Sequence, residues 1–261
     1  MADTRLAIGV DVGGSGIKAA VVDVDDGRFV SDRLRVPTPV PSTPDKVSAS
    51  IGRLVKRLIT ATDLPPAAPV GIGLPGVVLD GVLRTAANID AAWVDFPITQ
   101  KLSKSLKRPV TIVNDADAAG TAEMRFGIGA GRKGVVVLLT LGTGVGSAVF
   151  VDGKLVPNTE FGHLMIRGKE AEKRASEKVR EQKQLYWQQW AERLSEFLNE
   201  LEKLCSPDLF IMGGGISKKA EKFFPYLKTR TEVIVVPAQM RNEAGIIGAA
   251  YLAHVSSQQQ Q

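Results

Sequence analysis

One short pattern occurs twice in the chain, and this repetition constrains the fold more than any other feature. Residues 7–30 read AIGVDVGGSGIKAAVVDVDDGRFV, and residues 134–156 read GVVVLLTLGTGVGSAVFVDGKLV. Each stretch has an apolar run rich in β-branched residues, a glycine-rich turn, a second such run and an Asp-Gly turn. This order predicts antiparallel strands joined by tight turns. Two copies within 261 residues indicate an internal duplication and two lobes.

The rest of the sequence alternates strand and helix patterns, as expected of an α/β fold. Further strands are expected within residues 28–36, 69–78, 109–115, 206–217 and 232–238. Helices are expected over about 46–61, 97–106, 169–204, 218–227 and 242–255. We assign residues 1–113 to an N-terminal lobe and 114–243 to a C-terminal lobe. The small-residue helix at 244–261 is expected to pack back on the first lobe.

Composition excludes several classes of protein. The net charge is +5, but the basic residues are scattered, so we expect no nucleic-acid partner, while an anionic small molecule or polymer stays open. Cys205 is the only cysteine, which excludes a disulfide framework or a cysteine-rich metal site and fits a reducing compartment. Without an apolar run of membrane-spanning length or a signal-peptide pattern, we expect no membrane partner and a cytoplasmic location.

Glycine-rich loops are the candidates for phosphate binding. The loop of Gly13, Gly14, Ser15 and Gly16 opens a strand rather than a helix, so it fits neither the dinucleotide-binding fingerprint nor the P-loop. Uncovered backbone N–H groups at such a turn, with a Ser15 hydroxyl and the Lys18 ammonium, can hold phosphate oxygens; a glycine turn without a ligand is the alternative. The second copy repeats the loop with Gly142, Thr143 and Gly144, and a third loop at 213–215 precedes a helix.

Polar residues that could bind or deprotonate an acceptor occur in two other segments. Asn114 and Asp115 stand where a strand ends and a helix begins, so they are either helix N-cap residues or a general base at the end of the sheet. Glu160 and His163 lie within one four-residue segment and could both bind a ligand. The alternative for His163 is a structural histidine packed in the protein.

The order of these motifs resembles the ROK sugar-kinase family, within the actin/hexokinase-like superfamily. The matching segments are DVGGSGIK at 11–18, GLPG at 73–76, NID at 88–90 with Trp93, NDADAAG at 114–120, LGTGVG at 141–146, EFGH at 160–163 and GGG at 213–215. The resemblance implies a duplicated α/β fold of the ribonuclease H-like type, with a cleft between its two lobes. EFGHL followed by GKEAEKRAS, together with PDLFIMGGGISKKA, resembles the bacterial polyphosphate glucokinases and polyphosphate/ATP glucomannokinases of this family.

The resemblance also implies a role for each matching residue. Asp115 corresponds to the catalytic base for the sugar 6-hydroxyl, and the sugar ligands correspond to Asn88, Asn114, Asp115, Glu160 and His163. The phosphate loops correspond to Asp11, Gly13, Gly14, Ser15, Gly16 and Lys18, and to Gly142, Thr143 and Gly144. The nucleotide or donor side corresponds to Gly213, Gly214 and Gly215, and we add Lys218 and Lys219 as candidates flanking the path of an anionic donor, or as two solvated lysines.

The implied activity is transfer of a phosphoryl group from polyphosphate, and also ATP, to glucose or mannose. Mg²⁺ is the implied cofactor, with Asp11 as its contact directly or through water. Ordinary family members carry a cysteine-rich zinc motif that a single cysteine cannot form, so we expect no zinc. A homodimer is expected from the family, and the apolar stripe between Trp187 and Leu204 could serve either a subunit interface or the core.

Three alternative functions compete with this hypothesis. The first is an ATP-dependent hexokinase without polyphosphate activity. The second is a sugar-sensing transcription repressor of the same fold, for which the ten residues before Asp11 are too few to hold a helix-turn-helix domain. The third is an actin-like filament protein, against which the Glu-x-Gly-His motif argues.

Overall fold

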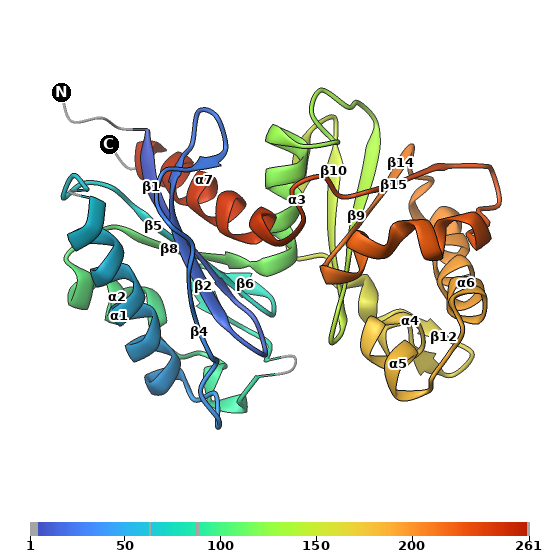
Figure 1. Ribbon diagram of the computed structural model, residues 1–261, viewed down its shortest axis with the longest axis horizontal. Coiled ribbons are helices and arrows are strands. Elements are labelled where there is room, and N and C mark those ends of the chain that lie inside the picture. Colours follow the sequence, from blue (N-terminus) through green and yellow to red (C-terminus); the bar gives the residue numbers. More distant parts are fainter. Residues whose placement is uncertain (1–4, 63, 87–88, 260–261) are drawn as a thin grey trace. The chain divides into compact units, whose positions relative to one another are not determined.

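Two mixed β-sheets organise the protein, one in each of two structural units (Figure 1). The computed structural model describes residues 5–62, 64–86 and 89–259. The first unit comprises Met1–Ala122 and Glu243–Gln261, and the second comprises Glu123–Asn242. Helix α3 (Asp115–Phe126) begins in the first unit and ends in the second.

The sheet of the first unit has the order β3-β2-β1-β5-β8, with β4 also paired to β2. Its strands are β1 (Leu6–Val12), β2 (Ile17–Asp23), β3 (Arg28–Phe29), β4 (Leu34–Val36), β5 (Val70–Leu74) and β8 (Val110–Asn114). β1 and β2 form an antiparallel hairpin, whereas β1, β5 and β8 run parallel to one another. The carboxyl ends of these three parallel strands therefore meet at one edge of the sheet.

Helices cover the first sheet on both faces. Helices α1 (Pro44–Thr62) and α2 (Ile98–Leu106) pack against each other, and α1 places Val47, Ile51 and Val55 in a core with Ile8 and Val10 of β1. The opposite face is covered by α7 (Ala244–Gln259), which contacts β1, β5 and β8 (Figure 1). The short strands β6 (Val78–Leu79) and β7 (Val82–Leu83) form a separate hairpin, followed by the turn of 3-10 helix η1 (Ala91–Trp93).

Glycines allow α7 to lie directly on the backbone of its neighbours. A methyl group added at Gly9 would overlap the carbonyl of Ile246, and one added at Gly71 would overlap the carbonyl of Ala249. Gly248 has the same relation to the backbone of α3, at the carbonyl of Ala118. Any larger residue at these positions would push the helix away, because protein interiors are already close-packed.

The sheet of the second unit repeats the arrangement of the first. Its order is β11-β10-β9-β14-β15, with strands β9 (Val135–Leu141), β10 (Val145–Val151), β11 (Lys154–Val156), β14 (Leu209–Gly213) and β15 (Ile234–Pro237). β9 and β10 form an antiparallel hairpin and β14 joins β9 in parallel, as β5 joins β1 in the first unit. The shared topology agrees with the duplication inferred from the sequence.

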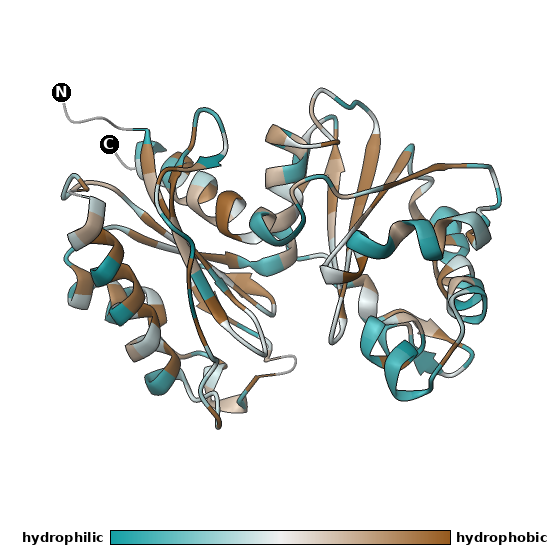
Figure 2. Ribbon diagram, viewed as in Figure 1, coloured by the Kyte–Doolittle hydropathy of each residue, from teal (hydrophilic) through white to brown (hydrophobic). Residues whose placement is uncertain are grey.

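The remaining elements of the second unit lie in two segments. One holds 3-10 helix η2 (Phe161–His163), β12 (Met165–Ile166), β13 (Lys169–Glu170), α4 (Glu172–Ala175), α5 (Glu177–Gln182) and α6 (Trp187–Cys205). The other holds the 3-10 helices η3 (Gly215–Lys222) and η4 (Phe224–Tyr226), and it ends in η5 (Arg241–Glu243), whose last residue belongs to the first unit. Apolar residues concentrate in the central strands of each sheet, while α4 and α5 are largely hydrophilic (Figure 2).

The apolar stripe of α6 belongs mainly to the core of the second unit. Trp190, Leu194, Phe197, Leu198 and Leu201 are fully buried, which supports the core interpretation over a subunit interface for these positions. At the end of the stripe Leu204 is 64% exposed. Among the residues that the structure describes, no helix is long and apolar enough to span a membrane.

Three expected elements differ in detail from the structure. Residues 28–36 form the two short strands β3 and β4, which both pair with β2, instead of one strand. Residues 169–204 form β13 and three helices, because Ser176 caps α5 and Gln184 takes a left-handed conformation before α6 begins. Residues 218–227 form 3-10 turns with a kink at Lys219 in place of an α-helix.

Candidate active site

The tip of the β1–β2 hairpin brings two opposite charges together. Asp11 and Lys18 are direct partners in the antiparallel register, and the Lys18 Nζ lies 2.8 Å from the Asp11 Oδ2. The backbone N–H of Gly13 donates to the carbonyl of Gly16 at 3.1 Å and closes the turn. The intervening Gly14 and Ser15 are both exposed to solvent.

Two side chains from the following segment hold this turn. Arg35 of β4 is the register partner of Lys18, and its Nη2 donates to the carbonyl of Ser15 at 3.2 Å. A methyl group at Gly16 would lie 2.8 Å from the Arg35 Nε, so a glycine leaves room for the guanidinium. The Thr38 hydroxyl donates to the carbonyl of Gly13 at 2.5 Å. No sequence motif marks Arg35, because only the pairing of β4 with β2 brings it to the loop.

Asn114 acts as the N-cap of α3. Its side-chain oxygen accepts hydrogen bonds from the N–H groups of Ala116 at 2.8 Å and Asp117 at 3.0 Å, and its Nδ2 donates to the carbonyl of Gly76 at 3.0 Å. The residue is buried, with 4% of its surface exposed. The structure therefore bears out the capping interpretation of Asn114, and the cap fixes the direction in which α3 leaves β8.

Asp115 follows Asn114 as the first residue of α3 and remains partly exposed. A methyl group at Gly73 would lie 3.5 Å from the Cα of Asp115, so β5 passes close to it. In the sheet register Asp11 pairs with Gly73, and Gly73 pairs with Val113, so Asp11 and Asp115 belong to the same edge. Negative charge at the first residue of a helix is also stabilised by the helix dipole.

Asn88, the remaining predicted sugar ligand of this part of the chain, lies outside the described residues.

The β9–β10 hairpin of the second unit repeats the turn of the first. Gly142 donates from its N–H to the carbonyl of Gly144 at 3.0 Å, and Thr143 between them is exposed. The carbonyl of Gly142 accepts from the N–H of Lys178 at 3.1 Å, which ties α5 to this hairpin.

The third glycine loop follows β14, the neighbour of β9. Gly213 pairs with Thr140, and Gly214 has φ +84°. A methyl group at Gly214 would overlap the carbonyl of Leu141, so both its conformation and its surroundings require glycine. Lys218 and Lys219 are exposed on η3 beyond this loop.

Glu177, at the start of α5, lies beside the third glycine loop. A methyl group at Gly215 would be 3.9 Å from the Glu177 Oε2. Burial raises the pKa of the Glu177 carboxyl, the nearby Glu181 raises it further, and Lys219 and Arg180 partly offset the rise. No sequence pattern marks Glu177, because only the fold brings α5 to this loop.

The loop that carries Glu160 and His163 is fixed to β10. The Ser147 hydroxyl donates to the carbonyl of Thr159 at 2.6 Å and accepts from the N–H of Phe161 at 2.9 Å. A methyl group at Gly162 would overlap the carbonyl of Val145, so only glycine lets η2 approach the strand this closely.

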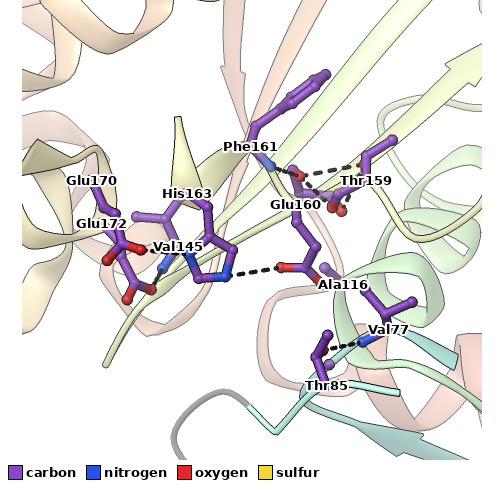
Figure 3. Close-up of polar contacts among 12 residues, drawn as sticks. Val77, Thr85, Ala116, Val145, Thr159, Glu160, Phe161, His163, Glu170 and Glu172 are labelled. Carbon is purple, nitrogen blue, oxygen red and sulfur yellow. Dashed lines mark hydrogen bonds and ion pairs between the residues drawn. The ribbon is translucent and has the colours of Figure 1, made fainter. Parts of the chain in front are cut away.

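His163 lies between two glutamates (Figure 3). Its Nδ1 is 3.2 Å from the Glu170 Oε1, and its Nε2 is 3.9 Å from the Glu160 Oε2, too far for a hydrogen bond. The Lys173 Nζ lies 2.5 Å from the second oxygen of Glu170. The hydrogen bond from Lys173 is the main cause of a lowered pKa of the Glu170 carboxyl, and the Lys173 pKa is raised in return.

The predicted sugar ligands and the two predicted phosphate loops are divided between the two units, and each unit brings its own share of them together. The first unit brings Asp11, Lys18 and Asp115 to one sheet edge. The second brings Gly142–Gly144 next to Gly213–Gly215 through the pairing of β9 with β14, and Glu160 next to His163. No sequence motif marks Glu170 or Lys173: Glu170 reaches His163 through the β12–β13 turn, and Lys173 binds Glu170.

Comparisons with known proteins identify relatives along most of the chain. The family model described as ROK family matches residues 7–175 and 166–256. The polyphosphate glucokinase of Mycobacterium tuberculosis (strain CDC 1551 / Oshkosh) is 48% identical over 247 residues, which cover 94% of this chain and 90% of that protein.

Solved structures agree with these relatives. The inorganic polyphosphate/ATP-glucomannokinase from Arthrobacter sp. strain KM is 46% identical with a TM-score of 0.92, and the alignment covers 98% of this chain and 100% of that one. A ROK family glucokinase from Streptomyces griseus, in complex with glucose and AMPPNP, is 28% identical with a TM-score of 0.82, covering 96% and 99%. The expected duplicated α/β fold is confirmed.

Proposed function

Since the chain belongs to the ROK family, we propose that it transfers a phosphoryl group from inorganic polyphosphate, or from ATP, to the 6-hydroxyl of glucose. The observation that carries the proposal is the similarity of 94% of the chain to a polyphosphate glucokinase. Each unit has one glycine hairpin of the same design. Two such turns with backbone N–H groups could bind a phosphoryl donor that has many phosphate oxygens.

Asp115 is the proposed general base. Its carboxylate accepts the proton of the 6-hydroxyl while the hydroxyl oxygen attacks the terminal phosphorus, and the bond from that phosphorus to the shortened donor breaks. The Asn114 cap and the nearby Gly73 hold the first turn of α3 in place, so the carboxylate starts from a fixed backbone position. Glu160 and His163 are the proposed ligands of the other sugar hydroxyls.

The glycine hairpins are the proposed phosphate sites. The exposed backbone at Gly14 and Ser15 offers N–H donors, and Lys18 and Arg35 place two cations beside that turn. Phosphoryl transfer depends mainly on positioning and charge neutralisation, which such a set of donors supplies without covalent chemistry.

The carboxylate oxygens of Asp11 suit Mg²⁺, because this ion prefers oxygen ligands. The carboxylate is 19% exposed and is packed against Gly245, where an added methyl group would lie 3.3 Å from the Asp11 Oδ1. Asp11 would hold the ion directly or through water, and Lys18 would keep the carboxylate oriented. When bound, Mg²⁺ neutralises charge on the phosphate oxygens.

Metal removal tests this part of the proposal. We expect dialysis against EDTA to abolish glucose phosphorylation, because the donor charge is no longer neutralised, and added Mg²⁺ to restore it. The thermal unfolding midpoint should stay the same after dialysis, since Asp11 already has Lys18 as a partner. Full activity in EDTA would contradict a metal-dependent reaction.

A matrix of two donors and three acceptors tests the function itself. Polyphosphate and ATP are each supplied with glucose, mannose or fructose, and phosphorylated sugar is measured. We expect activity with polyphosphate and glucose. Activity with ATP alone would instead support an ATP-dependent glucokinase, the function that the nucleotide-bound Streptomyces griseus structure favours as a second candidate.

Mannose and self-association extend the proposal. Mannose is the second acceptor that we propose, because the Arthrobacter enzyme is described as a glucomannokinase. A homodimer is also proposed, supported by the exposed Leu204 and Tyr186 at the two ends of α6. Light scattering gives the mass in solution, and a monomer at all concentrations would contradict it.

Lys218 and Lys219 are proposed to flank the path of an anionic donor. Reversing both charges, in K218E/K219E, should raise the KM for polyphosphate about tenfold, or ~1.4 kcal/mol, while the KM for glucose stays the same. The matched control is K56E/R57E, which reverses the charges of two consecutive, exposed basic residues on α1. An unchanged polyphosphate KM would leave the two lysines as solvated surface residues.

A further inference from the structure

The residues around His163 also determine which of its two ring nitrogens carries the proton. Its Nδ1 lies 3.2 Å from the Glu170 Oε1, within the range of a weak hydrogen bond, whereas its Nε2 is 3.9 Å from the nearest Glu160 oxygen. In a neutral imidazole one nitrogen carries a proton and the other accepts. The partner of one nitrogen therefore fixes the role of the other.

Glu170 is equipped to act only as an acceptor. Its second oxygen binds the Lys173 ammonium at 2.5 Å, and an ammonium group can only donate. That hydrogen bond lowers the pKa of the Glu170 carboxyl, so the group stays ionised and has no proton to offer. The proton of a neutral His163 ring must then be on Nδ1.

We propose that Glu170, held by Lys173, is a positioning residue that keeps His163 in the Nδ1–H tautomer with Nε2 as a hydrogen-bond acceptor. The Nε2 and the Glu160 carboxylate then form two acceptors 3.9 Å apart. Such a pair fits two neighbouring hydroxyl groups that both donate. This assignment rests on the proposed function for its ligand, a sugar, but the tautomer itself can be measured without one.

A bound cation is the competing explanation of this cluster. Among the described residues, His163, Glu170 and Glu172 have ligand atoms within 4.8 Å of one another. Two contacts argue against that use. The Lys173 ammonium already supplies positive charge to Glu170, and Glu172 accepts a hydrogen bond from the N–H of Val145 at 3.4 Å.

Nitrogen NMR on the protein without sugar tests the tautomer directly. The chain has two histidines, so the variant H254Q leaves only the His163 ring in a long-range ¹H–¹⁵N correlation spectrum. We expect the proton on Nδ1. The ring signals should not change after treatment with EDTA, and a change on chelation would overturn the proposal in favour of a metal-held ring.

The variant E170Q should reverse the tautomer. Lys173 can bind only the amide oxygen of the new side chain, so the amide NH₂ group faces Nδ1 and donates to it. The ring proton then moves to Nε2. The control K169Q changes the exposed neighbour on the same strand and should give the spectrum of the parent. The variant K173M should also keep the proton on Nδ1, because the carboxylate remains.

Kinetics then separates positioning from folding. With Nε2–H in place of an acceptor, E170Q should raise the KM for glucose about tenfold and leave the KM for polyphosphate unchanged. A proton on Nε2 in the parent, or an E170Q spectrum identical to that of the parent, would overturn the proposal. If the protein phosphorylates no sugar, the proposed function fails, but the NMR result still decides the tautomer.

Discussion

Replacing Asp115 with asparagine lowers kcat for glucose phosphorylation by about 10²–10⁴-fold, the usual contribution of a positioned general base. Asparagine has nearly the same shape as aspartate, so the α3 N-terminus and the Asn114 cap should remain intact. What is lost is the carboxylate that accepts the proton of the 6-hydroxyl. Initial rates at saturating glucose and donor measure the effect.

Two controls make this result specific to the base. D26N makes the same chemical change at an aspartate paired with Arg28 on the surface and should keep full activity. Glucose binding to D115N, followed by calorimetry, should change much less than kcat. Activity of D115N close to that of the parent would remove Asp115 from the mechanism, whatever the donor.

Replacing Trp190 with alanine lowers the free energy of unfolding by about 3–5 kcal/mol, the range for removing a buried tryptophan. The ring is fully buried in the second unit, edge-on to Phe223 at 4.9 Å between centroids. Its Nε1 donates to the carbonyl of Ala175, the last residue of α4, at 2.9 Å. Chemical denaturation followed by circular dichroism measures the loss.

The variant W190F separates the two contributions of this side chain. It keeps an aromatic ring in the core but leaves the Ala175 carbonyl without its donor, a loss of about 1–3 kcal/mol. W187A, which truncates a partly exposed tryptophan one turn away on α6, should cost less than W190A. Equal losses for W187A and W190A would mean that burial does not set the effect.

The fold could be predicted from the sequence where local patterns decide it. The runs of aliphatic residues around Gly13–Gly16 and Gly142–Gly144 alternate with turn residues, and these turns do join antiparallel strands in the structure. The helical pattern at 169–204 was misleading. Charged residues there favour helix throughout, whereas the breaks come from Ser176, whose side chain caps α5, and from Gln184, which takes a left-handed conformation.

The candidate site was only partly accessible from the sequence. Asn114 could be identified as a polar residue at a strand–helix junction, but its use as a cap is visible only in its hydrogen bonds. Arg35 reaches the first glycine turn through strand pairing, and Glu170 reaches His163 through a two-residue turn. Neither residue belongs to a motif, so no local pattern marks it.

The placement of α7 on the first sheet has a consequence for synthesis on the ribosome. The strands of the first unit emerge early, but the helix that covers one face of their sheet is translated only after the 120 residues of Glu123–Asn242. At a translation rate of about 5–20 residues per second, that face of the sheet stays exposed for roughly 6–24 s before α7 is synthesised. The contiguous second unit can complete its folding first, while that face of the first sheet is still exposed.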